Sequence, residues 1–512
     1  MREISMERVN ATRNEILSII KDRTLTHEQK VASLAVKADS LMEVLELPEG
    51  LEERLNLDPA DKIICDLNEG HAPMRPRYII PDYAKFMKNG SKFLQLDPPT
   101  DIWEAVNSLL IFYKNVPSVT NFPVYVGNID ELLEPFVVDE AEAKKAIRLF
   151  LTHIDRTILD SFCHANIGPR ATKAGRLILE VEAELENAVP NLTLKYDPDI
   201  TPDDFALLAI DTALKTAKPS FANHKMFSEE LTEDYVIASC YNGLKLGGGS
   251  YTLCRVLLGN LAKKADNIEH FKKEVLPETL EIMAAYMDER IRFMVEESGF
   301  FESNFLALEG FISKENFTAM FGMVGLAECV NTLLEKEGIQ GRYGHAEVAD
   351  NLGISIMEIM DEFNKNHVSP YCYGADGHFL LHAQVGIDLD VNSSPGCRIP
   401  IGEEPEELID HLAHCAKFHK YFPSGVGDIF PIDTTVHKNM DYLLDIIKGA
   451  FNNKVRYISV YEKDSDVIRV TGYLVKKSEM EKLKKGENVL QDTTVLGLGA
   501  SKNSHILERK VR

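Results

Sequence analysis

Helix-like and strand-like segments alternate through the middle of this sequence. Between about residues 102 and 350, stretches with apolar residues at helical spacing, such as EAEAKKAIRLFLTHIDRTILDSF, alternate with short apolar runs typical of strands: FPVYVG, LTLKY, DYVIASCY and NFLAL. Strands that alternate with helices pair in parallel, because each helix carries the chain back to the start of the next strand. The pattern predicts an α/β architecture with a largely parallel sheet.

The last part of the chain has a different pattern. A helical stretch, NMDYLLDIIKGAFN, is followed by two β-branched runs, VRYISVY and VIRVTGYLV, which are separated by the polar residues EKDSD. We therefore expect a division into residues 1–440 and residues 441–512, with a helical N-terminus before the α/β region.

Charge and cysteine usage narrow the function. The 80 acidic and 56 basic residues give a net charge of -24 without a concentrated basic stripe, which argues against nucleic acid as a partner. No window approaches a membrane span, and the N-terminus lacks a secretory signal, so we expect a cytoplasmic protein. The eight cysteines form no C-x-x-C pair, which argues against a structural zinc site or a disulfide framework.

Gly472 lies inside the strand-like run VIRVTGYLV. Glycine is disfavoured in a strand because it has no side chain to pack and loses the most entropy on ordering. The ordinary explanation is a β-bulge. A chemical explanation is also open: the glycine α-carbon, between an amide nitrogen and a carbonyl, delocalises an unpaired electron when the backbone becomes planar.

The residues around Gly472 carry a family resemblance. Arg469-Val470-Thr471-Gly472-Tyr473 resembles the signature of glycyl radical enzymes, whose radical glycine lies close to the C-terminus. The resemblance implies a ten-stranded barrel of two parallel half-barrels surrounded by helices. Residues 1–440 would then hold the barrel, and residues 441–512 would form the glycyl radical domain with Gly472 in a buried loop.

Such an enzyme also needs a cysteine that relays the radical to the substrate. Cys240 ends the apolar run DYVIASCY and precedes Gly247–Gly249, and strand ends are where α/β folds place chemistry. The stretch through RVLLGNLA is similar to the thiyl-cysteine region of anaerobic (class III) ribonucleotide reductases. Free cysteines are often simply buried core residues. Cys254 is the nearest rival, and we expect Cys329 to be structural.

Several family patterns are missing from this chain. No cysteine follows Cys415, so the zinc-binding cysteines of class III reductases are absent. Cys240 is followed by Tyr241, whereas pyruvate formate-lyase-like enzymes use two adjacent cysteines. Asn242 stands where related dehydratases and lyases place a glutamate base. The overall outline is most similar to the YjjI-type branch of glycyl radical enzymes.

Other residues are candidates for acid–base or binding roles. With Asn242 in place of the glutamate, another carboxylate is needed for elimination, and the candidates are Glu309, Glu69 and Asp66. His71 and Asn242 complete the set of possible acid–base or substrate-binding residues.

Further polar residues have a structural alternative. His378 and His382 are more often structural in such contexts. Arg398 and Arg75 offer guanidinium groups that could hold a carboxylate or phosphate, although structural pairing explains them equally well.

The resemblance implies a reaction scheme. A separate radical S-adenosylmethionine activase removes a hydrogen from Gly472, Cys240 becomes a thiyl, and the thiyl abstracts hydrogen from a small polar substrate for elimination or bond cleavage. No permanently bound cofactor is expected, and a homodimer is plausible by the same resemblance. The alternatives are a radical reductase of a ribose or nucleotide substrate and a non-catalytic protein that repairs or partners a damaged enzyme.

Overall fold

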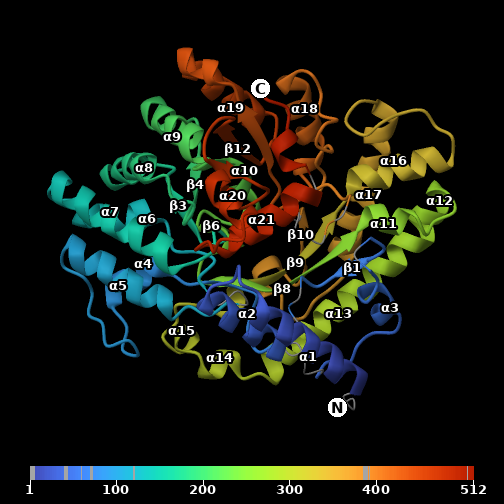
Figure 1. Ribbon diagram of the computed structural model, residues 1–512, viewed down its shortest axis with the longest axis horizontal. Helices are drawn as coiled ribbons and strands as arrows, with labels where there is room; N and C mark the ends of the chain where they lie inside the picture. Colours follow the sequence, from blue (N-terminus) through green and yellow to red (C-terminus); the bar gives the residue numbers. More distant parts are fainter. Residues whose placement is uncertain are drawn as a thin grey trace.

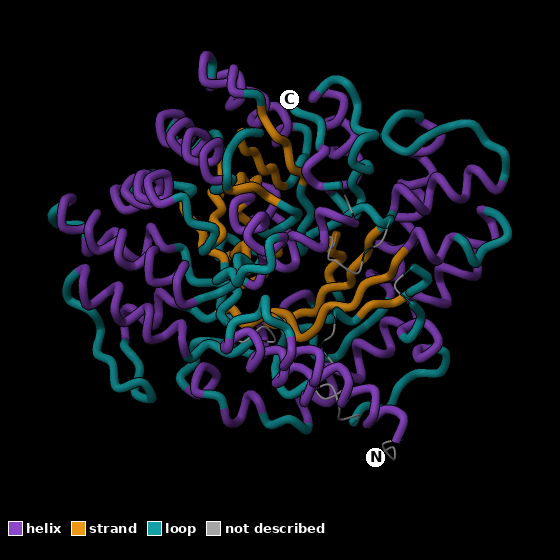
Figure 2. Tube along the Cα trace, viewed as in Figure 1, coloured by secondary structure: helices purple, strands orange, loops and turns teal. Residues whose placement is uncertain are grey.

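Two five-stranded sheets face each other at the centre of the molecule. The computed structural model describes residues 6–39, 44–58, 60–67, 69, 73–118, 122–383, 390, 392–503 and 505–512. Figure 2 shows the two groups of strands surrounded by helices. In Figure 1 the first sheet is seen on the side of α7, α8 and α9, and the second on the side of α13, α16 and α17.

The first sheet has the order β11-β12-β5-β4-β3. Neighbours are parallel except for β5 and β12, which are antiparallel. Every residue of β3, β4, β5 and β11 is buried, which is typical of strands covered on both faces. The strands are β3 (His164–Ile167), β4 (Asn191–Tyr196), β5 (Ser220–Asn223), β11 (Asp428–Ile432) and β12 (Tyr457–Glu462).

The second sheet contains the longest strand of the described chain, β8. Strands β8, β9 and β10 are parallel, while the short strands β1 and β2 pair antiparallel with β8. The strands are β1 (Ile64–Cys65), β2 (Tyr78–Ile80), β8 (Gly248–Leu257), β9 (Phe317–Val324) and β10 (Leu380–Ala383). Together the two sheets form the predicted α/β barrel, in which antiparallel pairs join the parallel segments.

Amphipathic helices cover the outer faces of both sheets. On α8, for example, Thr172 accepts a hydrogen bond from the Gly175 amide and so caps the N-terminus, while Ile178 and Val181 are buried. The main covering helices are α7 (Glu140–Thr157), α8 (Lys173–Leu185), α9 (Asp203–Thr216), α11 (Leu258–Ala262), α13 (Leu276–Glu296), α16 (Leu326–Lys336), α17 (Glu347–Asn366), α18 (Leu408–His419) and α19 (Met440–Asn452).

Further helices lie in the connections and at the N-terminus. They are α1 (Met6–Lys21), α2 (His27–Asp39), α3 (Leu51–Leu55), α4 (Tyr83–Asn89), α5 (Ile102–Lys114), α6 (Ile129–Leu133), η1 (Glu134–Phe136), α10 (His224–Glu230), α12 (Ile268–His270), η2 (Phe271–Val275), α14 (Phe300–Ser303), α15 (Phe305–Leu308), η3 (Lys314–Asn316), η4 (Tyr373–Ala375) and η5 (Thr434–Lys438). The expected strand NFLAL is wrong, because these residues form α15. No described helix combines the length and the apolar character that crossing a membrane requires.

Two β-hairpins are separate from the sheets. The hairpin of β6 (Tyr235–Ala238) and β7 (Asn242–Lys245) lies between the sheets, since Asn166 of β3 exchanges hydrogen bonds with Ile237 and Tyr241 donates to the carbonyl of Ala383 in β10. The second hairpin is β13 (Val467–Arg469) and β14 (Leu474–Lys476). It is followed by α20 (Lys477–Lys484), α21 (Asp492–Asn503) and η6 (Ile506–Glu508).

Strand β12 lies in the segment 441–512 that the sequence assigns to the C-terminal domain. It nevertheless pairs with β5 on one side and β11 on the other. The division at residue 440 stays a prediction about domains, while the hydrogen bonding of the barrel extends to Glu462.

A buried ion pair ties α8 to the start of β5. The Lys218 ammonium lies 2.8 Å from a carboxylate oxygen of Glu182, and the two side chains are 0% and 1% exposed. The same ammonium donates to the carbonyl oxygen of Pro190. Burial lowers the pKa of Lys218 and raises that of Glu182, so each charge depends on the other.

We predict that Lys218→Met destabilises the barrel by about 3–5 kcal/mol, because it leaves Glu182 buried without its cation. Urea denaturation under anaerobic conditions should show a clearly lower midpoint. The control is Lys215→Met, which removes the exposed pair with Asp211 and should leave the midpoint almost unchanged. Equal midpoints for the two variants would contradict the assigned role of the buried pair.

Candidate active site

Gly472 lies in a buried turn between β13 and β14. The amide of Val470 donates to the carbonyl oxygen of Tyr473 across the turn, at 3.0 Å. Val470, Tyr473 and Leu474 are each 0% exposed, and Gly472 itself is buried. The glycine that looked out of place in a strand is therefore in a connecting turn, shielded from water.

The Gly472 carbonyl is held from the barrel wall. The side-chain amide of Asn191, the first residue of β4, donates to this oxygen at 2.9 Å, and Arg469 approaches it at 3.5 Å. Arg469 also donates to Asn191 Oδ1 and to the Ala217 carbonyl. These donors fix the turn and polarise the carbonyl next to the glycine α-carbon.

The C-terminal residues hold the same turn from the other side. The Arg509 guanidinium donates to the carbonyl oxygens of Arg469, at 2.8 Å, and Val470. Arg512 continues this attachment, because its backbone exchanges hydrogen bonds with Pro431 and Asp433 at the end of β11. The turn is thus enclosed between β4 and the chain terminus.

Cys240 lies at the tip of the β6–β7 hairpin, in the barrel interior. It is 2% exposed, and the preceding residue, Ser239, adopts a left-handed backbone conformation with φ of 57°. His164 of β3 donates from Nδ1 to the Ser239 carbonyl at 2.8 Å. Burial lowers the pKa of His164 to about 3, so the ring is neutral and its Nε2 accepts a hydrogen bond.

The Cys240 thiol donates a hydrogen bond to the side-chain oxygen of Asn242, with Sγ and Oδ1 3.0 Å apart. Burial raises the pKa of this thiol to about 11, an effect only partly offset by the hydrogen bonds of the hairpin tip. The group therefore stays protonated at neutral pH. This environment therefore keeps the hydrogen on the sulfur.

Strand β4 brings the two loops together. Asn191 and Thr193 are two residues apart, so their side chains lie on the same face of the strand, about 7 Å apart along it. Asn191 holds Gly472, whereas Thr193 hydrogen bonds to the Tyr457 hydroxyl at 2.8 Å and to His164 Nε2 at 2.7 Å. The same Tyr457 hydroxyl lies 3.3 Å from the Cys240 carbonyl oxygen. One face of one strand thus positions both loops.

The candidate carboxylates have other hydrogen-bond partners than Cys240. Glu69 accepts from Arg290 at 2.9 Å, Arg77 at 2.6 Å and Thr252 at 2.8 Å, in a buried network beside β8. Asp66 borders that network, with the Tyr286 hydroxyl 3.4 Å away.

Glu309 follows α15 and accepts from the Phe93 amide near the surface. Cys240 is not among these partners of the three carboxylates, so a role as general base stays a prediction for each of them.

The remaining candidate residues differ in whether the structure shows a contact with Cys240. Asn242 is the one that directly contacts Cys240, whereas His71 lies outside the described residues. His382 is buried with its ring centroid 5.9 Å from that of Tyr241, and His378 bonds to the His367 carbonyl.

The rival cysteines also lie within the core. Cys254 and Cys329 are both fully buried, in β8 and α16, and burial raises the pKa of each thiol well above its usual value.

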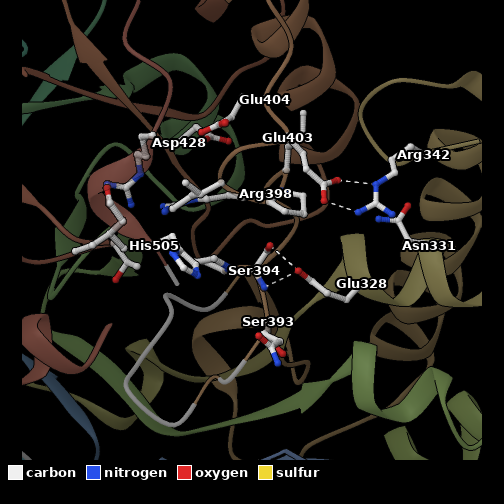
Figure 3. Close-up of a pocket in the computed structure, with 18 of the residues that line it drawn as sticks. Glu328, Asn331, Arg342, Ser393, Ser394, Arg398, Glu403, Glu404, Asp428 and His505 are labelled. Carbon is white, nitrogen blue, oxygen red and sulfur yellow. Dashed lines mark hydrogen bonds and ion pairs between the residues drawn. The ribbon is translucent and has the colours of Figure 1, made fainter. Parts of the chain in front are cut away.

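A cavity of about 430 Å³ adjoins the Gly472 turn through Thr471. Its lining includes Arg398, Arg509 and Asp428. Figure 3 shows this pocket, with Glu403 paired to Arg342 and Ser394 bonded to Glu328. Arg398 therefore borders a cavity next to the Gly472 turn. The sequence predicts this arginine as a possible ligand for an anion.

Beside this cavity, His411, Cys415 and Asp428 gather in a group that the sequence analysis did not identify. Their possible ligand atoms lie within 4.8 Å of one another. However, Arg512 donates to His411 Nδ1 at 3.0 Å, so a neutral ring carries its proton on Nε2 and has no lone pair there. The group is therefore better explained as a hydrogen-bonded cluster, in which the Cys415 thiol donates to Asp428 at 3.1 Å.

Comparisons with known proteins show the family of this chain. The model of the family described as "Glycyl radical enzyme YjjI-like" matches residues 25–512. An uncharacterized protein of Haemophilus influenzae is 46% identical over 505 residues, covering 98% of each chain.

Solved structures share the fold. The B12-independent glycerol dehydratase of Clostridium butyricum has a TM-score of 0.64 at 12% identity, covering 100% of this chain and 86% of that one. The anaerobic ribonucleotide reductase of Thermotoga maritima has a TM-score of 0.60 at 12% identity, covering 94% and 91%. Both likenesses support the barrel fold.

We predict that Cys240 titrates far above an ordinary thiol. The rate at which iodoacetamide alkylates Cys240 in the native protein, measured by peptide mass spectrometry, should keep rising towards pH 11 because only the thiolate reacts. A short exposed cysteine peptide is the control, and its rate should level off above its pKa of about 8.5. A Cys240 rate that levels off together with the peptide would contradict the prediction.

Proposed function

Because the chain belongs to the YjjI-like family of glycyl radical enzymes, we propose that Gly472 stores the radical and that Cys240 delivers it to the substrate as a thiyl. The observation that carries the proposal is the inward face of β4, where Asn191 holds the Gly472 turn and Thr193 is linked to the Cys240 loop. A relay of hydrogen atoms requires such closeness between the two loops.

The proposed reaction moves one hydrogen atom at a time. A separate activase, using S-adenosylmethionine, takes a hydrogen atom from the α-carbon of Gly472. Cys240 then gives its S–H hydrogen to that carbon and becomes a thiyl, which abstracts hydrogen from a substrate carbon. The substrate radical loses a leaving group or breaks a bond, and the product radical takes hydrogen back from Cys240.

The surroundings of both residues suit these steps. Burial of the Gly472 turn excludes water from the stored radical, and the raised pKa of Cys240 keeps its hydrogen in place. Asn242 accepts from the thiol through Oδ1, while its Nδ2 has no hydrogen-bond partner among the described residues. We propose that this amide donates to a substrate oxygen.

The reaction class that we propose is radical elimination or bond cleavage on a small polar substrate. Asn242 is an amide and takes up no proton, so it does not act as the general base that a glutamate at this position would supply. The cavity of about 430 Å³ beside Thr471 matches a small molecule in size. The possession of its own buried cysteine, linked to the glycine turn, favours an enzyme over a repair or partner protein.

We predict that anaerobic incubation with the cognate activase and S-adenosylmethionine produces an electron paramagnetic resonance doublet from Gly472. The doublet arises because the unpaired electron couples to the hydrogen that remains on the α-carbon. Gly472→Ala should abolish this signal, whereas alanine at Gly449, an exposed glycine in α19 with open space around it, should retain it. A full doublet in Gly472→Ala would place the radical elsewhere.

We further predict that Cys240 exchanges hydrogen with Gly472 even without substrate. In D2O the thiol carries deuterium, and reversible transfer should replace the α-hydrogen of Gly472, so the doublet collapses towards a single line. Cys240→Ala should keep the doublet in D2O, because the relay is missing, while Cys254→Ala should collapse like the wild type. Collapse at the wild-type rate in Cys240→Ala would refute the relay.

A further inference from the structure

Arg398 is a buried cation that forms no ion pair with a carboxylate in the described part of the chain. Its side chain is 7% exposed, and its Nε donates to the carbonyl oxygen of Gly427 at 2.7 Å. Nη2 is buried and has no hydrogen-bond partner among the residues that the structure describes. A guanidinium has five N–H donors, so most of its capacity is unused.

Several other buried arginines in this protein face carboxylates. Arg255 pairs with Asp390, Arg290 with Glu69 and Arg456 with Glu230. This is the expected arrangement, because a buried charge is costly unless it is paired. In the described chain no carboxylate oxygen lies within 4.0 Å of the Arg398 guanidinium. Arg398 therefore carries its charge without an ion pair in the described chain, and the neighbouring Arg469 and Arg509 donate to amide or backbone carbonyl oxygens instead of carboxylates.

The acids that line the same cavity already have partners. Glu403 binds Arg342, and Glu328 accepts from the amide and hydroxyl of Ser394 while burial raises its pKa. Asp428 accepts from the Cys415 thiol and faces His411 at 3.8 Å. Arg398 attracts Asp428 at longer range and helps to lower the pKa of that carboxyl, but the unused N–H donors of Arg398 stay available to a molecule that enters the cavity (Figure 3).

Arg398 also lies close to the proposed reaction centre. Its guanidinium carbon is 5.9 Å from the ring centroid of Tyr241, the residue after Cys240, and Thr471 lines the same cavity. Arg469 and Arg509 add positive charge around it. Burial lowers the pKa of each, and repulsion from Arg398 contributes. An anion bound to Arg398 would therefore lie beside both the hairpin tip that carries Cys240 and the turn that carries Gly472.

We propose that Arg398 binds an oxyanion of the substrate, a carboxylate or a phosphate, and so presents the neighbouring carbon to Cys240. This inference rests on the proposed function and names its substrate class. Two N–H groups of a guanidinium match two oxygens of either anion, at about 2.8 Å. The small polar substrate is therefore an acid or a phosphate ester, held by its charge at one end.

The test measures binding to the full-length protein before activation, so it is independent of radical chemistry. Isothermal titration uses inorganic phosphate and lactate as the anionic probes and glycerol as the neutral one, at constant ionic strength. We expect saturable binding of phosphate or lactate, about 30-fold or more weaker in Arg398→Gln and partly retained in Arg398→Lys. The stronger of the two anions identifies the type of oxyanion.

Arg342→Gln is the matched control, because Arg342 lines the same cavity but is already paired with Glu403. It should bind the anion like the wild type. Equal binding in wild type and Arg398→Gln, or no binding of either anion, would overturn the proposal. The Gly472 doublet, recorded in Arg398→Gln after activation, verifies the fold and shows whether the radical function holds separately.

Discussion

Strand β4 is the element on which the proposed chemistry depends. Its alternation of side chains sends Asn191 and Thr193 to the same inner face, and these two residues reach loops that are separated by more than two hundred residues in sequence. A shift of one residue in the pairing of β4 with β3 and β5 would turn both side chains away. Strong burial of all six residues of β4 fixes this register.

Burial has two opposing consequences at this centre. It shields the Gly472 turn from water and keeps the Cys240 thiol protonated, yet it also hides the glycine from the activase that we propose. Apolar packing around Val470 and Tyr473 encloses the turn, and Asn191, Arg469 and Arg509 hold it through hydrogen bonds to backbone carbonyls rather than through a continuous sheet. Such contacts can be released without breaking a strand of the barrel, because β13 and β14 pair only with each other.

Much of the fold could be predicted from sequence, since LTLKY and VRYISVY have the β-branched or apolar pattern of buried strands and form β4 and β12. The strand predicted for NFLAL is wrong because a short apolar run does not distinguish a strand from a buried helical turn. In the structure the Asn304 side chain caps the helix by accepting from the Leu306 amide. FPVYVG is mostly buried but forms no strand, and the residue after it, Asn128, makes only an isolated bridge with Asn166.

Gly472 and Cys240 could be proposed from motifs because their neighbours in sequence are also their neighbours in the loop. The carboxylates could not, because sequence position does not tell which partner a buried acid will find, and Glu69 finds Arg290 and Arg77. Likewise the sequence does not distinguish Arg398 from the other arginines. Only the structure shows that it lines the cavity without an ion pair in the described chain.

Asn242 and Arg398 together constrain the chemistry more than either residue alone. A neutral amide beside the thiol leaves the hydrogen on sulfur and adds no negative charge, so it does not repel an anion held nearby. A glutamate at 242 would place a carboxylate close to the position that we propose for an acidic or phosphorylated substrate, and the Coulomb repulsion between the two anions would be strong in the dry interior. Asparagine at this position is therefore consistent with the anionic substrate that we propose, because the site lacks a proton acceptor there while Arg398 would supply the charge that orients the reacting carbon.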